Sequence, residues 1–124
     1  MRIKISTTST GDVYGKISEE NPKTSQAIFN ALPIDAKANT WGDEIYFRIS
    51  VEVEAENLRE VVEIGDIAYW PPGNAFCIFF GPTPISTGSE IKPASSVNVI
   101  GKIIGDSTVF KKVNIGENIK LERA

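Results

Sequence analysis

The chain has 124 residues, of which 41% are hydrophobic, and a formal net charge of −3. This is the length of one domain, and the apolar share is sufficient for a core, so we expect a single folded domain over residues 1–124. The acidic balance excludes nucleic acid as the default partner, because phosphate binding needs clustered Lys and Arg.

Two absences restrict the chemistry further. The sequence contains no histidine and one cysteine, Cys77. Catalysis by a histidine base, Ser–His or Cys–His nucleophiles and histidine-ligated metals are therefore excluded, as are intrachain disulfides and Cys-cluster zinc sites. We predict no cofactor or metal, and we interpret Cys77, which lies in an apolar run, as a small buried hydrophobe.

The N-terminus and the hydropathy predict a cytoplasmic protein. Met1–Ile5 alternates apolar and polar residues and lacks the apolar segment of a signal peptide. No stretch approaches the roughly 20 apolar residues of a membrane span, so we expect no membrane association.

A hairpin and a helix are predicted at the start of the chain. The alternating segments Met1–Ile5 and Val13–Ile17 flank the turn residues Thr10–Asp12. A helix is then predicted over Pro22–Leu32, because Asn21 can cap free N–H groups and proline is favoured at the first helical position. The apolar face of this helix consists of Ala27, Ile28, Ala31 and Leu32, and Pro33 ends it.

Strands dominate the rest of the chain. Alternation of apolar and polar residues predicts strands at 44–49 and 51–56. Further strands are predicted at 61–64, 67–70, 75–80, 97–104 and 118–122, with a short helix at 106–112. About eight short strands separated by Gly/Pro turns predict a mainly β fold, either a barrel or a sandwich.

The order of these elements resembles the cyclophilin fold. Pro22–Leu32 is similar to the cyclophilin helix segment, Ile78–Phe80 to the FFI run of the central strand, and Val99–Ile103 to a later V-x-G-K-V strand. A small prokaryotic cyclophilin-like family of unassigned function is a closer resemblance. The segments that carry it are Asn39–Phe47, Arg59–Asp66, Tyr69–Gly73, Phe79–Gly81 with Thr83–Pro84, and Lys92–Ile103. The resemblance implies a closed barrel of about eight strands with a helix, and no established activity.

Candidate binding residues follow from the resemblance and from strand alternation. In cyclophilins the second Phe of the FF pair lines the proline pocket and the first enters the barrel core. This implies that Phe80 faces a groove and Phe79 the core, on opposite sides of the strand. The alternative is that both rings are simply buried. Tyr69 and Trp70 precede a Pro-Pro turn and are expected to form walls of the same groove.

The predicted function is binding. Arg48 and Tyr46 lie on the wet face of a predicted strand, but the cyclophilin F-H-R motif is missing, and Arg48 does not align with its arginine. We therefore predict a module that binds a peptide segment or a small ligand in an apolar groove, rather than an enzyme. The predicted groove residues are Arg48, Tyr46, Tyr69, Trp70 and Phe80. The alternatives are a weak peptidyl-prolyl cis/trans isomerase and a structural subunit of a larger assembly.

Other conspicuous residues have simpler interpretations. Trp41 is interpreted as a core residue. Glu52, Glu54 and Glu56 share one face of a predicted strand, where a solvated surface is favoured over a Mg²⁺ or Ca²⁺ site. Asp66 follows Gly65 and is expected to bond turn backbone.

Overall fold

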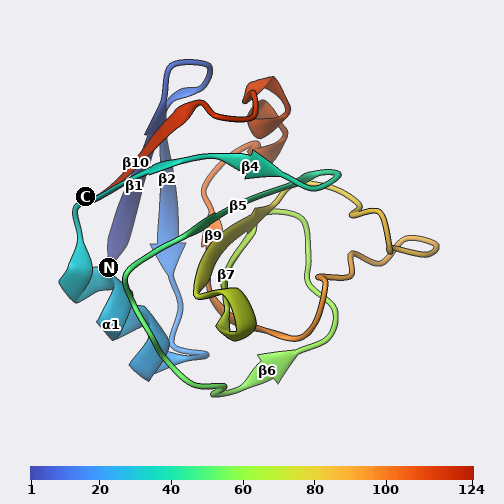
Figure 1. Ribbon diagram of the computed structural model, residues 1–124, viewed down its shortest axis with the longest axis horizontal. Coiled ribbons are helices and arrows are strands. Elements are labelled where there is room, and N and C mark those ends of the chain that lie inside the picture. The colour runs from blue at the N-terminus through green and yellow to red at the C-terminus, as the bar shows by residue number, and fades with distance from the viewer.

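One antiparallel sheet forms a nearly closed barrel in the computed structural model, which describes residues 1–124 (Figure 1). The strands along the chain are β1 (Arg2–Thr7), β2 (Gly11–Ile17), β3 (Ile34–Lys37), β4 (Asn39–Thr40), β5 (Glu44–Arg48), β6 (Leu58–Arg59), β7 (Asp66–Trp70), β8 (Ala75–Phe79), β9 (Val97–Ile103) and β10 (Asn118–Arg123). The helices are α1 (Pro22–Ala31) and two 3₁₀ helices, η1 (Pro71–Gly73) and η2 (Ser107–Lys112).

The sheet closes because its two end strands are consecutive in the chain. The strand order is β3-β10-β1-β2-β9-β7-β8-β5-β4, with β6 paired to β9. Only Ala38 separates β3 from β4, and it is fully buried. Its N–H donates to the Glu117 carbonyl and its own carbonyl accepts from the Gly116 N–H, so this junction is fixed on both sides.

The mainly β barrel predicted from the sequence is confirmed. The opening hairpin pairs Arg2 with Lys16 through to Thr7 with Gly11. The helix α1 ends one residue before the predicted end. The short C-terminal helix is the 3₁₀ helix η2, and the Asp106 carboxylate caps it by accepting from the Thr108 N–H. No helix of the fold combines the length and the apolar composition needed to cross a membrane.

The strand predicted at 51–56 is wrong, because this segment is extended but pairs with no strand. The buried side chain of Asn98 forms hydrogen bonds with the backbone of this segment instead. The Asn98 carboxamide accepts from the Glu56 N–H (2.9 Å) and donates to the Glu54 carbonyl (3.0 Å). The strand predicted at 61–64 likewise reduces to a single bridge, between Val62 and Ile91.

Glu52 and Glu54 are exposed, as expected of a solvated surface, although the segment that carries them is not a strand. Glu56 instead caps α1. Its carboxylate accepts from the backbone N–H groups of Lys23 (3.2 Å) and Thr24 (3.1 Å) and from the Thr24 hydroxyl (2.9 Å). Two of the free N–H groups at the helix start are thereby satisfied from a distant part of the chain.

Asn21, which was expected to cap this helix with its side chain, makes no such bond. Its amide nitrogen donates to the Val99 carbonyl (2.7 Å), and its amide oxygen accepts from the Asn57 N–H (2.6 Å). Asn21 therefore joins β9 to Asn57, and Glu56 caps the helix in its place.

The core has two separate parts. Twenty buried residues fill the barrel, and a second cluster of eight lies outside it. Strand β8 contributes to both, since Phe76 and Ile78 point into the barrel while Ala75, Cys77 and Phe79 point outward. This alternation places an apolar layer on the outer face of the sheet.

Replacing Glu56 with Ala tests the helix cap. Loss of the cap should lower the free energy of unfolding by about 1 kcal/mol. Glu54→Ala is the matched control, because Glu54 is exposed and its side chain makes no hydrogen bond or ion pair. Its effect should stay within about 0.5 kcal/mol. Urea unfolding of both variants measures the difference, and equal losses would refute the capping assignment.

Candidate functional site

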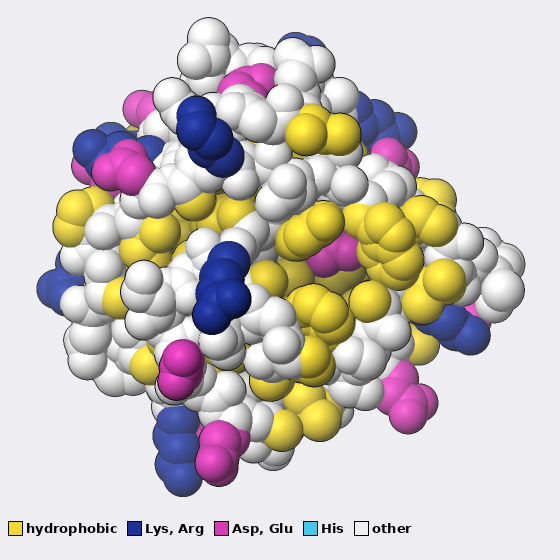
Figure 2. Space-filling model, viewed as in Figure 1, with side chains coloured by type: hydrophobic (Ala, Val, Ile, Leu, Met, Phe, Trp, Pro, Cys, Tyr) yellow, Lys and Arg dark blue, Asp and Glu magenta, His cyan; other side chains and the backbone are white.

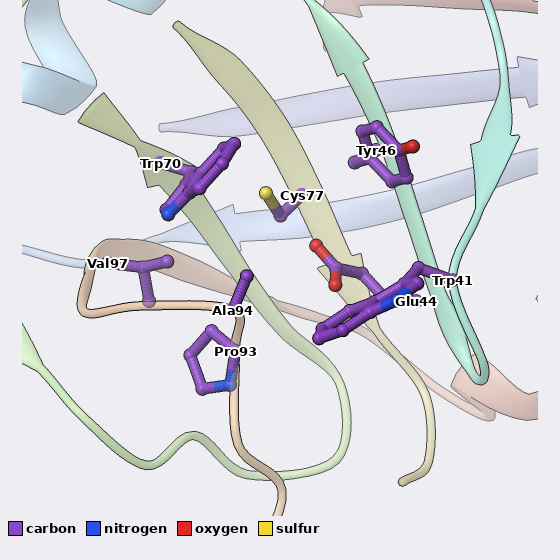
Figure 3. A pocket seen from close by; sticks show the side chains of 8 residues that line it. All are labelled: Trp41, Glu44, Tyr46, Trp70, Cys77, Pro93, Ala94 and Val97. Atoms are coloured by element: carbon purple, nitrogen blue, oxygen red, sulfur yellow. The ribbon is translucent and has the colours of Figure 1, made fainter. Parts of the chain in front are cut away.

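A pocket opens in the outer apolar layer, between the sheet and the chain that covers it. This chain, residues 81–96 between β8 and β9, is called the covering segment below. Its volume is about 180 Å³. The pocket is lined by Trp41, Glu44, Tyr46, Trp70, Cys77, Pro93, Ala94 and Val97, and is called the Glu44 pocket below. Figure 2 shows an acidic side chain inside a hollow of hydrophobic surface, and Figure 3 shows Glu44 at the pocket.

The floor of the Glu44 pocket is built by strand register. Glu44 and Tyr46 are two residues apart on β5 and therefore share its outer face. Tyr46 lies opposite Cys77 of β8, and Trp70 at the end of β7 lies opposite Ala75 of the same strand. Three adjacent strands thus bring a carboxyl, a thiol and two aromatic rings together (Figure 3).

A tight turn places Trp41 at the pocket. The Trp41 N–H donates to the Glu44 carbonyl (2.9 Å), which closes the turn between β4 and β5. Gly42 adopts a φ of 60° there, and a Cβ at this position would lie 2.8 Å from Cδ of Pro84 and 3.0 Å from the Pro82 carbonyl oxygen. Only glycine fits this turn without strain or displacement, so the indole position depends on it.

The segment that covers the layer is fixed by side-chain hydrogen bonds. The Ser86 hydroxyl accepts from the N–H groups of Thr83 (2.9 Å) and Lys92 (3.0 Å), and the Thr83 hydroxyl donates to the Lys92 carbonyl. Farther along, the Trp70 indole N–H donates to the Ser95 hydroxyl (2.7 Å). This last bond ties a wall of the pocket directly to the covering segment.

Glu44 is the only charged group that lines the pocket. The residue is 6% exposed, and it forms no ion pair. Burial raises the pKa of its carboxyl from 4.5 to about 7, and the nearby Cys77 thiol opposes this rise in part. Burial also raises the pKa of Cys77 well above its usual value, so this thiol is a neutral group and not an activated nucleophile.

The other buried carboxylate, Asp66, contrasts with Glu44. It accepts a hydrogen bond from the Glu63 N–H (2.8 Å), which confirms the predicted turn contact. Arg59 and Lys102 each place a nitrogen 3.7 Å from its oxygens. Burial raises the pKa of Asp66, and the backbone bond and both cations oppose that rise. Asp66 thus has two charged partners, whereas Glu44 has none.

The predicted groove residues are divided between different places. Tyr46 and Trp70 both line the Glu44 pocket. Arg48 is exposed on β5, the strand of Tyr46, but it borders a separate polar hollow with Ser50, Glu52 and Asn74.

Tyr69 and Phe80 lie in the barrel core. Tyr69 is fully buried, and its hydroxyl donates to the Val51 carbonyl (2.6 Å). Phe80 is 3% exposed and packs against Phe110, with ring centroids 6.2 Å apart. The implied orientation of the FF pair is therefore wrong: Phe80 points into the barrel and Phe79 into the outer cluster. The physical reason is register, because a shift of one residue exchanges the two faces of a strand.

The sequence interpretation missed most of the pocket. Trp41, interpreted as core, is half-buried at its edge, and Glu44 and Cys77 were not selected. One signal was present. The run Ala75–Phe80 is apolar at successive positions, which indicates a strand covered on both faces and therefore a second apolar layer. No group of three or more Cys, Asp or Glu side chains is placed to hold a metal ion.

The barrel, its end helix and the outer layer define a small cyclophilin-like domain. The family model described as Cyclophilin-like matches residues 1–122, so the chain belongs to the cyclophilin-like family. The solution structure of a hypothetical protein from Archaeoglobus fulgidus is similar, with 51% sequence identity and a TM-score of 0.86 over 100% of this chain and 95% of that one. A search of curated proteins gave no match. The family is of uncharacterised function, so any activity has to be argued from the pocket.

The raised pKa of Glu44 predicts a specific dependence of stability on pH. The folded carboxyl binds protons up to about pH 7, whereas the unfolded one releases them near 4.5. The free energy of unfolding should therefore fall as pH rises between these values, by up to about 3 kcal/mol, and level off above them.

Glu44→Gln should remove this contribution and be more stable than the wild type above pH 7. Denaturant unfolding of both proteins from pH 4.5 to pH 8 gives the difference, in which other titrating groups such as Asp66 cancel. Parallel stability curves for the two proteins would show that Glu44 titrates normally.

Proposed function

We propose that this protein binds a small ligand in the Glu44 pocket. The observation that carries the proposal is an accessible apolar cavity with one buried carboxyl that has no charged partner. Buried polar groups that do no structural work are concentrated at functional sites, because each of them costs stability. Glu44 fits this description, and the paired Asp66 does not.

The dimensions of the pocket favour a small ligand over an extended peptide. Cavities that hold drug-sized ligands measure roughly 300–1,000 Å³, and a cavity of about 150 Å³ holds a benzene molecule. At about 180 Å³ the pocket accepts one compact group. The aromatic walls supply a large apolar contact area for such a group.

The side chains in the pocket support binding more than catalysis. The Cys77 thiol is held neutral by burial, and no Lys or Arg is present to stabilise a developing anion. No observation favours the isomerase alternative, since Arg48 borders another hollow and the Phe80 ring is enclosed in the core.

A variant that blocks the pocket tests the proposal. Ala94 is an exposed residue that lines the pocket, so Ala94→Trp should fill it without disturbing the barrel core. We expect a panel of one-ring and branched compounds, neutral, cationic and anionic, to contain binders that shift the wild-type amide resonances of Trp41 and Cys77. Ala94→Trp should weaken that binding at least about tenfold.

Ala55→Trp is the matched control, because Ala55 is also exposed but lies in the segment beside α1, away from the pocket. It should bind as the wild type does. The proposal is overturned if no compound in the panel binds, or if the two tryptophan variants bind equally.

A further inference from the structure

We infer that the ligand of the Glu44 pocket is a compact organic cation, an alkylammonium group, held between the Glu44 carboxylate and the rings of Trp41, Tyr46 and Trp70. This inference rests on the proposed function of the same pocket, and it adds the chemical class of the ligand.

The charge of the pocket favours a cation. Glu44 is buried and points into the pocket, and no Lys or Arg lines that pocket (Figure 3). Lys92, in the covering segment, is paired with Glu90 at 3.1 Å. The negative charge of Glu44 therefore has no partner within the protein, and only a proton or a cationic ligand can neutralise it.

The arrangement of the aromatic rings also favours a cation. Trp41, Tyr46 and Trp70 stand around the floor formed by Glu44 and Cys77 (Figure 3). Aromatic faces carry negative electrostatic potential and attract ammonium groups, most strongly when water is excluded. The Trp70 N–H, which would suit an anion, is occupied by Ser95. The aromatic walls and the carboxylate in the floor thus both favour a positively charged ligand.

The groups in the pocket do not suit a metal ion. Mg²⁺ and Ca²⁺ are coordinated by several oxygen ligands from carboxylates, carbonyls and waters, and soft metals by several thiolates or imidazoles. The pocket offers one carboxyl and one protonated thiol. A volume of about 180 Å³, larger than the roughly 150 Å³ that holds benzene, suits a branched alkylammonium group instead.

Protonation of Glu44 competes with the ligand. The titratable groups that face its carboxyl are the Tyr46 phenol on β5 and the Cys77 thiol on β8. The other pocket residues, from β7, β9, the turn at Trp41 and the covering segment, carry no titratable group. The adjacent Asp43 carboxylate lies against Gly81 at the turn. Cation binding should therefore strengthen as pH rises through about 7, where Glu44 ionises.

A matched pair of ligands isolates the charge. Choline and 3,3-dimethylbutan-1-ol have nearly the same shape, with nitrogen replaced by carbon, and choline does not titrate. Isopentylammonium and isopentanol form a second pair with a primary amine. At pH 8 we expect calorimetry to show that at least one cation binds about tenfold or more tightly than its neutral partner.

The affinity for the cation should fall about tenfold between pH 8 and pH 6, because the ionised fraction of Glu44 falls by that factor. This comparison uses the wild-type protein, so it does not depend on the folding of any variant. Glu44→Gln should abolish both the preference for the cation and its dependence on pH. Glu19→Gln, at an exposed carboxylate that forms no ion pair, should keep both.

The outcomes separate the inference from the function on which it rests. If neutral compounds bind, are blocked by Ala94→Trp, and match or exceed the two cations, the pocket is a binding site and the cation inference is wrong. The cation inference is also overturned if neither cation binds, or if Glu44→Gln leaves cation binding unchanged. If no compound of the panel binds, the proposed function itself is overturned.

Discussion

The architecture of this protein depends on one strand that is buried on both faces. β8 is apolar at all of its positions, so both sides must be kept from water. Its inward residues Phe76 and Ile78 complete the barrel core, and its outward residues Ala75, Cys77 and Phe79 require a second cover. Ile91, in the chain between β8 and β9, and Val97, the first residue of β9, pack on this outer layer as part of that cover. The Glu44 pocket is the place where the cover is incomplete.

The two buried carboxylates, Asp66 and Glu44, differ in the charged and polar groups that surround them. Asp66 lies beside two cations and a backbone donor, which oppose part of the cost of its burial. Glu44 lies in the apolar outer layer beside the neutral Cys77 thiol, whose hydrogen bond goes to the Ala75 carbonyl. A glutamine of similar shape would avoid the cost of ionising there. The retention of a group that is expensive for stability is consistent with a role in recognition.

Much of the fold was predictable because the deciding interactions are local. The hairpin, α1 and the central strands follow from periodicity and turn residues. The segment 51–56 was not predictable in this way, since alternation alone cannot show that Asn98, 42 residues after Glu56, supplies its hydrogen bonds. Glu56 caps α1 from a similar distance in sequence, which no local pattern reveals.

The pocket was predictable only in part, for a related reason. Tyr46 and Trp70 were identified as aromatic residues of the sheet, and the structure brings them together. The identification of Glu44 required the register of β5 against β8 and the path of the covering segment, which are both non-local. The faces of Phe79 and Phe80 were exchanged because alternation fixes their opposition but not which one points inward.

The bonds that shape the pocket also limit how it can respond to a ligand. The Trp70 indole is held by Ser95, and the Trp41 backbone is held by a turn that admits only glycine at position 42. The rings therefore stay apart around the carboxyl instead of collapsing onto it. A site whose walls are already ordered loses little conformational entropy on binding. If the proposed site binds a cation, its selectivity comes from this ordered shape and from the single carboxylate of Glu44, which is charged above about pH 7.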